Sequence, residues 1–122
     1  MDRKHLLILY VEDTPTSVRF YERLLGRAPL ESSPGFAMFA LADGLMLGLW
    51  RRAGVEPTPK AAPGGSELCI TLASDAEVDQ FHARWRELGV AIAQAPARME
   101  FGYNAVALDP DGHRLRALCP AG

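Results

Sequence analysis

An internal repeat is the feature that most constrains how this chain can fold. Both halves of the sequence show the same order of apolar runs, helix signals and turns, and a segment rich in proline and glycine, residues 52–66, separates them as a linker. The first half predicts a strand, a helix and three strands at residues 5–11, 14–26, 28–32, 36–41 and 45–51. The second half predicts the same series at residues 67–72, 74–89, 90–94, 104–108 and 109–119. We therefore expect one α+β domain, residues 1–122, that contains two tandem βαβββ modules at 5–51 and 67–119.

Short capping motifs mark where the two helices begin. Thr14 is expected to be the N-cap of the first helix, with Pro15 at the first helical position, and Gly26 is expected to end it. Ser74 and Glu77 form a capping box, which predicts that the second helix begins directly after Ser74.

The last strand carries the most unusual residue of the chain. Residues 109–112 form a turn motif, after which the side chains alternate between two faces of a strand. The alternation places Leu115 and Ala117 on one face and Arg114, Arg116 and Leu118 on the other. If the second face lines a cavity, Arg116 is a guanidinium held inside a binding site.

The two copies of the module can be aligned on each other. The Asp-Gly turns of the two halves differ by 68 positions, which places Gly48 on Arg116 (48 + 68 = 116). The helix starts differ by 61 positions, which places Leu6 on Glu67 (6 + 61 = 67). These four positions are therefore predicted to be equivalent in pairs.

Alternation along the strands separates a core face from a second face in each copy. The apolar series expected to pack under the helices are Leu7, Leu9 and Val11; Leu45, Leu47 and Leu49; Leu68, Ile70 and Leu72; and Leu115 with Ala117. The opposite faces carry Leu6, Ile8 and Tyr10; Met46, Gly48 and Trp50; Glu67, Cys69 and Thr71; and Arg114, Arg116 and Leu118. Such a mixture suits a mostly apolar pocket with a few polar groups that orient a ligand.

Composition and charge argue against several function classes. The net charge of -2 gives no electrostatic reason to bind nucleic acid or an anionic membrane, and no apolar run approaches the length of a membrane span or a secretion signal. We therefore expect a cytoplasmic protein. Cys69 and Cys119 lie far apart and form no C-x-x-C motif, so we expect two reduced and mostly buried thiols.

Several stretches resemble a known superfamily. The opening ILYVEDTPTSVRFYERLLG, the middle LMLGLW and the closing ALDPDGHRLRAL resemble the glyoxalase, bleomycin-resistance and extradiol-dioxygenase superfamily, also called the vicinal oxygen chelate superfamily. Within it, LGLW, SELCITL, EFGY and DPDGHRLRALCP are most similar to phenazine antibiotic-resistance proteins, which bind their drug rather than transform it. The resemblance implies curved sheets around a cavity, and a homodimer that completes it.

The resemblance also implies where a metal would be held. Enzymes of the superfamily bind a divalent metal with four His, Glu or Gln side chains, at positions that correspond to Leu6, Gly48, Glu67 and Arg116. Only Glu67 could coordinate, and Arg116 would repel a cation, so we expect neither a metal nor a cofactor. The alternative is a metal-dependent glyoxalase- or dioxygenase-type enzyme with a degenerate site, in which Glu67 and His5 contribute ligands.

The function expected from these observations is metal-independent binding and sequestration of a planar aromatic molecule, such as a phenazine-like antibiotic. Trp50 would stack on the ligand, and Arg116 and Glu67 would orient it. Further residues expected to line the site are Tyr10, Met46, Gly48, Phe101 and Tyr103. Structural roles are open for each of them: a salt bridge for Glu67 with Arg116, a dimer contact for Trp50, and core or rim positions for the others. A third possibility is a structural or regulatory module whose cavity its own side chains fill.

Overall fold

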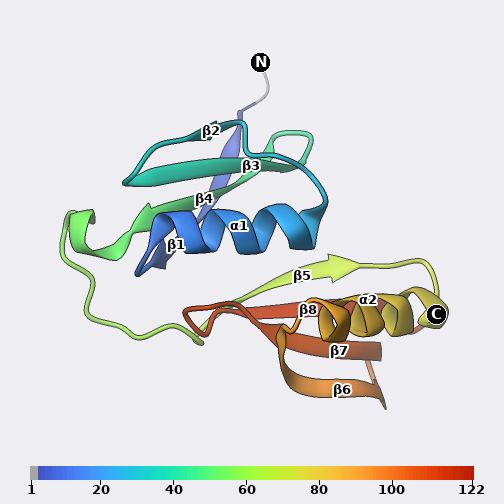
Figure 1. The fold of residues 1–122 in the computed structure, drawn as a ribbon. Coiled ribbons are helices and arrows are strands. Elements are labelled where there is room, and N and C mark those ends of the chain that lie inside the picture. Colours follow the sequence, from blue (N-terminus) through green and yellow to red (C-terminus); the bar gives the residue numbers. More distant parts are fainter. Residues whose placement is uncertain (1–2) are drawn as a thin grey trace. The chain divides into compact units, whose positions relative to one another are not determined.

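A computed structural model describes residues 3–122 of the chain and divides it into two compact units. Unit 1 is Met1–Ala61 and unit 2 is Ala62–Gly122. Each unit contains one four-stranded sheet with a helix packed on one of its faces (Figure 1). The predicted α+β fold with two βαβββ modules is thus confirmed. The boundary at residues 61 and 62 lies inside the segment that the sequence marks as a linker.

Unit 1 follows the predicted order of elements. They are β1 (His5–Val11), α1 (Thr14–Leu25), β2 (Glu31–Ser32), β3 (Phe36–Ala42), β4 (Leu45–Arg51) and the short 3-10 helix η1 (Arg52–Gly54). The strand order in the sheet is β1-β4-β3-β2, with β1 parallel to β4 and the other pairs antiparallel. The second strand is shorter than the predicted 28–32, because only its last two residues pair with β3.

Unit 2 repeats this topology. Its elements are β5 (Glu67–Thr71), α2 (Asp75–Glu87), β6 (Ala91–Met99), β7 (Gly102–Leu108) and β8 (Arg114–Pro120). The strand order β5-β8-β7-β6 matches that of unit 1, and β5 is parallel to β8. The register also agrees with the sequence alignment of the copies: Ile8 lies opposite Gly48 and Cys69 lies opposite Arg116, as the offsets of 61 and 68 require (8 + 61 = 69).

Further predicted boundaries are wrong, among them the start of β7, which is Gly102 rather than residue 104. The N-cap of α1 is Asp13 rather than Thr14: Asp13 has extended backbone angles, and its carboxylate accepts a hydrogen bond from the Thr16 amide at 3.1 Å. In unit 2, β6 continues to Met99 through a stretch that the sequence suggests is a loop. Register shifts on both sides of Gln94 accommodate Pro96 in this edge strand, where a missing N–H is tolerated.

The buried core of each unit lies between its helix and its sheet. The buried hydrophobic residues there are Leu9, Val11, Tyr21, Ala37, Phe39, Leu47 and Leu49 in unit 1, and Val78, Trp85, Ala105, Ala107, Leu115 and Ala117 in unit 2. Val55 and Val106 are also buried, and Val106 lies on the opposite face of its sheet. The buried hydrophobic residues on β1, β4 and β8 fall on the strand faces predicted to pack under the helices, although Leu45, predicted on the same face, is 37% exposed. Each large aliphatic side chain contributes about 1.5–3 kcal/mol by leaving water. Phe39 is therefore a core residue.

The turn before β8 is built as its sequence predicts. One oxygen of Asp109, Oδ1, accepts hydrogen bonds from the amides of Asp111 and His113 at 2.9 and 2.8 Å, and Gly112 has a φ of 94°. This turn sets the start of β8 and therefore the register of Arg116. No helix within residues 3–122 is long and apolar enough to cross a membrane.

Candidate functional site

The sheet of unit 1 has an apolar face on the side away from α1. We call it the aromatic face; it consists of Leu6, Ile8 and Tyr10 on β1, Phe36 and Met38 on β3, and Met46, Gly48 and Trp50 on β4. None of these side chains is charged. Leu6 and Ile8 are 41% and 39% exposed, although both are large and hydrophobic. An exposed apolar face of this kind favours contact with an apolar partner or ligand.

Three aromatic side chains form a row across this face. Tyr10 lies opposite Trp50 in the register, and Trp50 lies opposite Phe36. The rings of Tyr10 and Trp50 have centroids 6.2 Å apart and meet edge to face at 80°. Because the edge-to-face contact uses only part of the indole surface, a planar ligand ring could stack on Trp50 while Tyr10 supports it.

Gly48 creates room for this row. A Cβ atom at this position would lie 3.1 Å from the Phe36 ring and 3.3 Å from Ile8. The absence of a side chain therefore lets the Phe36 ring lie over the strand. Met46 lies on the same face, opposite Leu6 on β1 and Ala40 on β3. Tyr10, Met46, Gly48 and Trp50, which the sequence predicts as site residues, are thus brought together on one face of unit 1.

The corresponding face of unit 2 is polar. We call it the polar face; it consists of Glu67, Cys69 and Thr71 on β5, Asn104 and Val106 on β7, and Arg114, Arg116 and Leu118 on β8. Cys69 is exposed and Cys119 is partly exposed, so the prediction of mostly buried thiols is wrong. Cys69 lies on the polar face because the alternation of β5 reserves the core side for Leu68 and Ile70.

Glu67 and Arg116 form a bidentate ion pair on the polar face. The Arg116 Nε donates to Glu67 Oε2 at 2.5 Å, and Nη2 donates to Oε1 at 3.1 Å. The hydrogen bond from Arg116 lowers the pKa of Glu67, and the hydrogen bond to Glu67 raises the pKa of Arg116. Both groups are therefore charged at neutral pH, and the salt bridge that the sequence left open is present.

Two other predicted site residues lie apart from each other. The ring of Phe101 is 50% exposed, and its centroid lies 5.9 Å from the Arg116 guanidinium carbon. Tyr103 points to the side of the sheet that carries α2, where its hydroxyl donates to Asp79 Oδ1 at 2.7 Å and Arg98 lies over its ring. This hydrogen bond raises the pKa of Tyr103. Phe101 thus accompanies the ion pair, whereas Tyr103 does not.

Phe36 and Asn104 are site residues that the sequence reasoning missed. Each sits on the strand next to a predicted site position, and the two are equivalent under the offset of 68 (36 + 68 = 104). A signal for Asn104 was present, because it is the only polar side chain in the apolar run 104–108. For Phe36 the alternation of β3 was available, with Phe39 on the opposite face.

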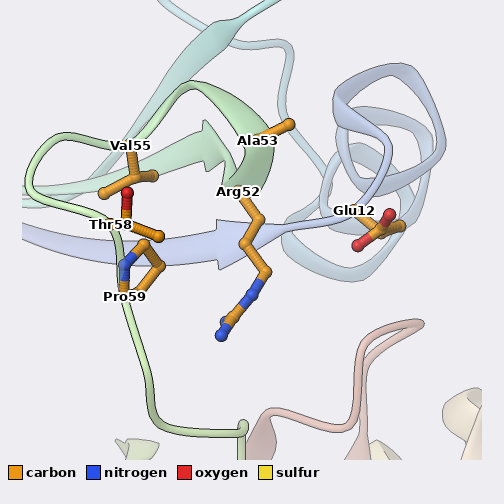
Figure 2. Close-up of a pocket in the computed structure, with 6 residues that line it drawn as sticks. All are labelled: Glu12, Arg52, Ala53, Val55, Thr58 and Pro59. Atoms are coloured by element: carbon orange, nitrogen blue, oxygen red, sulfur yellow. The ribbon is translucent and has the colours of Figure 1, made fainter.

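Unit 1 also contains a small pocket where β1 and β4 end (Figure 2). It has a volume of about 280 Å³ and is lined by Glu12, Arg52, Ala53, Val55, Thr58 and Pro59. Arg52 Nη2 donates to the Ala61 carbonyl at 3.0 Å, which holds the segment that follows η1. The volume lies just below the range of about 300–1,000 Å³ that is typical of drug-sized ligands.

The four positions that the superfamily uses for a metal do not fit a divalent cation here. Leu6 and Gly48 offer no donor atom, the Glu67 carboxylate is paired with Arg116, and the guanidinium is itself a cation. Within residues 3–122, no three His, Cys, Asp or Glu side chains are placed to hold a metal ion.

Comparison with known proteins identifies the family. The model of the Glyoxalase/Bleomycin resistance protein/Dioxygenase superfamily matches residues 3–117. The chain belongs to this superfamily. Among curated proteins, a phenazine antibiotic resistance protein from Enterobacter agglomerans is 27% identical over 119 residues, which cover 95% of this chain and 90% of the relative.

Solved structures support the same family. A protein of Agrobacterium tumefaciens, determined in solution by NMR, is 50% identical, covers 100% of both chains and has a TM-score of 0.89. A glyoxalase/bleomycin resistance protein/dioxygenase from Nocardioides is 27% identical, covers 100% of this chain and 87% of its own, and has a TM-score of 0.77.

Proposed function

We propose that this superfamily member binds and sequesters a planar aromatic small molecule, phenazine-like in shape, without a metal ion. The observation that carries the proposal is the aromatic face of unit 1, where Trp50 lies between Tyr10 and Phe36 on an uncharged, partly exposed sheet surface. The similarity to a phenazine antibiotic resistance protein supports the choice of ligand class.

Stacking on Trp50 would supply the main contact. Burial of an aromatic ring against the aromatic face removes apolar surface from water at about 25 cal/mol per Å², and ring stacking adds about 0.5–1.5 kcal/mol. Met46 and Ile8 are apolar neighbours on the same face. Gly48 has no side chain, so nothing projects from the strand at the centre of the face. The face carries no carboxylate, imidazole, amine or thiol, so binding rather than conversion is the role proposed for it.

The polar part of the proposal rests on unit 2. Arg116 and Glu67 are assigned the recognition of polar ligand atoms, with Phe101 as an exposed ring beside the guanidinium. We further propose that the protein acts as a homodimer, as the superfamily resemblance implies. Light scattering checks this part directly: a mass of two chains is expected, and a mass that stays near 13.3 kDa at all concentrations contradicts it.

The test is calorimetric titration of the protein with phenazine and with a non-planar compound of similar size. Wild type should bind phenazine, and Trp50→Ala should weaken binding about tenfold or more. Leu30→Ala is the matched control, because Leu30 is an exposed apolar residue of unit 1 outside the aromatic face. Equal affinities in wild type and Trp50→Ala would contradict the proposal.

A further inference from the structure

Arg116 is held in one orientation by two partners. Its Nε and Nη2 pair with both oxygens of Glu67, and its Nη1 donates to Asn104 Oδ1. Asn104 is fully buried, and its own Nδ2 donates to the Ala97 carbonyl at 3.3 Å. Because β6 anchors the Asn104 amide, the guanidinium cannot rotate about its long side chain without the loss of hydrogen bonds on two sides. Such pre-organisation lowers the entropy cost of binding a ligand.

The network leaves part of the guanidinium available. An arginine carries five N–H donors, and three of them are used by Glu67 and Asn104. The other two make no hydrogen bond with any residue from 3 to 122 in the structure. Arg116 is 15% exposed at its side chain, so a small polar group can still reach it. The ligand group that binds these two N–H donors must be a hydrogen-bond acceptor, because a guanidinium only donates.

The charge of the polar face favours an anion. Glu67 neutralises one arginine, while Arg114 on the same face leaves a net positive charge. Asn104 fixes Arg116 through a neutral amide, so it orients the guanidinium without cancelling a second positive charge. A carboxylate at the same position would hold Arg116 equally well but would repel an anionic ligand.

We propose that the polar face binds the carboxylate of an aromatic acid, with Arg116 as the contact residue and Asn104 as its positioning residue. The exposed Phe101 ring, 5.9 Å from the guanidinium carbon, supplies apolar surface for the ring of the acid. This assignment concerns unit 2 alone and goes beyond the proposed function, because it names a second class of ligand, a small aromatic acid that carries a carboxylate.

The experiment compares benzamide with benzoate by calorimetry. Wild type should bind benzoate about tenfold more tightly, as a charge-assisted hydrogen bond allows. Arg116→Gln should bind both compounds equally. Asn104→Ala should reduce the preference while thermal unfolding stays cooperative, a pattern that a general loss of structure would not produce.

Two further variants make the result decisive. Asn104→Asp keeps the shape of the side chain and so replaces Asn104→Ala if that variant does not fold. Its added negative charge should also reduce the preference. Arg98→Gln is the control, because Arg98 belongs to unit 2 but pairs with Asp75 on α2; it should retain the full preference. Equal binding of the two compounds by wild type, or a preference that survives in Arg116→Gln, would overturn the inference.

The carboxylate site and the proposed ring sequestration can fail independently, and the experiments distinguish the two failures. If phenazine does not bind to wild type, ring sequestration is wrong, and benzoate still tests the carboxylate site of unit 2. The probe is the Nε–H signal of Arg116 in a nitrogen-15 NMR spectrum during titration with benzoate. A saturable shift in wild type that is weaker in Asn104→Asp supports the site, and an unchanged signal contradicts it.

Discussion

The two units use one topology to build two different surfaces. In unit 1, Gly48 leaves space that the Phe36 ring fills, and the result is an uncharged aromatic face. In unit 2, the equivalent positions hold Arg116 and Asn104, and the result is a hydrogen-bonded network that also includes Glu67. The core sides of the two sheets remain apolar. The comparison teaches that the strand register fixes which residues meet, while the residue types at those positions decide the chemistry.

The largest expected loss of stability is at Gly102, where the backbone of unit 2 has a conformation and a close contact that favour glycine. Gly102 has a φ of 146°, and a Cβ there would lie 2.2 Å from the Cys119 carbonyl oxygen. Gly102→Ala should lower the free energy of unfolding by about 3 kcal/mol or more, as measured by denaturant unfolding. Pro34 is the equivalent residue in unit 1 (34 + 68 = 102), and Pro34→Ala should cost less than about 1 kcal/mol. Similar losses in both variants would contradict the close backbone approach at Gly102.

The second prediction exchanges the chemistry of the two faces. Gly48→Arg places the residue of unit 2 at its equivalent position in unit 1, where no carboxylate on the aromatic face can pair with it. Steric pressure on Phe36 and burial of the side-chain stem should lower the free energy of unfolding by about 2–4 kcal/mol. Gly48→Ala adds only the Cβ and should cost less. Thermal unfolding should show a larger loss of stability for Gly48→Arg than for Gly48→Ala. A Gly48→Arg protein as stable as wild type would contradict the claim that the two faces differ in chemistry at this position.

The third prediction concerns the ion pair and its pH dependence. Glu67→Gln should lower the free energy of unfolding by about 1 kcal/mol at pH 7, because the pair is partly exposed. The pKa of Glu67 is lowered from 4.5 by its hydrogen bond with Arg116, so the stabilisation is present above pH 4.5 and is lost as the pH falls through the folded-state pKa.

Denaturant unfolding at several pH values measures this difference. Wild type and Glu67→Gln should converge in strongly acidic solution and separate toward neutral pH. Glu87→Gln is the control, since the exposed pair of Glu87 with Arg84 at 3.7 Å should contribute little at any pH. A constant gap between wild type and Glu67→Gln across the pH range would show that the ion pair is not its cause.

The smallest expected effect separates Tyr103 from the binding residues. Tyr103→Phe removes the hydrogen bond to Asp79 on the α2 side of the sheet and should lower stability less than Glu67→Gln. Its affinity for phenazine should equal that of wild type in a calorimetric titration. A clear loss of affinity would place Tyr103 among the residues that contact the ligand, as the sequence first suggested.

Much of this fold could be predicted from the sequence because local signals agreed with each other. Apolar alternation predicted the core side of β1, β4, β5 and β8, and the matching turns allowed the two copies to be aligned. The errors arose where tertiary pairing overrides local preference: β6 continues past Pro96 because β7 supplies a partner strand. The N-cap at Asp13 depended on a choice between two good capping residues that only the backbone angles decide.

The candidate site was less predictable, because its contacts cross from strand to strand. Alternation placed Trp50 and Arg116 on the faces away from the helices, but the hydrogen bond of Arg116 with Asn104 depends on the pairing of β7 with β8. The packing of Phe36 on Gly48 depends in the same way on the pairing of β3 with β4. The face of Tyr103 could not be assigned from the sequence, because the predicted strand began after it; the structure places it on the α2 side.

The most direct test of the central claim observes the two tryptophans of the chain separately. Each indole N–H gives one signal in a nitrogen-15 NMR spectrum, and Trp50→Phe assigns them. On titration with phenazine, the Trp50 signal should shift and saturate, while the signal of Trp85, which is 2% exposed in the core of unit 2, should stay in place. A Trp50 signal that does not move while phenazine binds would contradict the assignment of the ligand to the aromatic face.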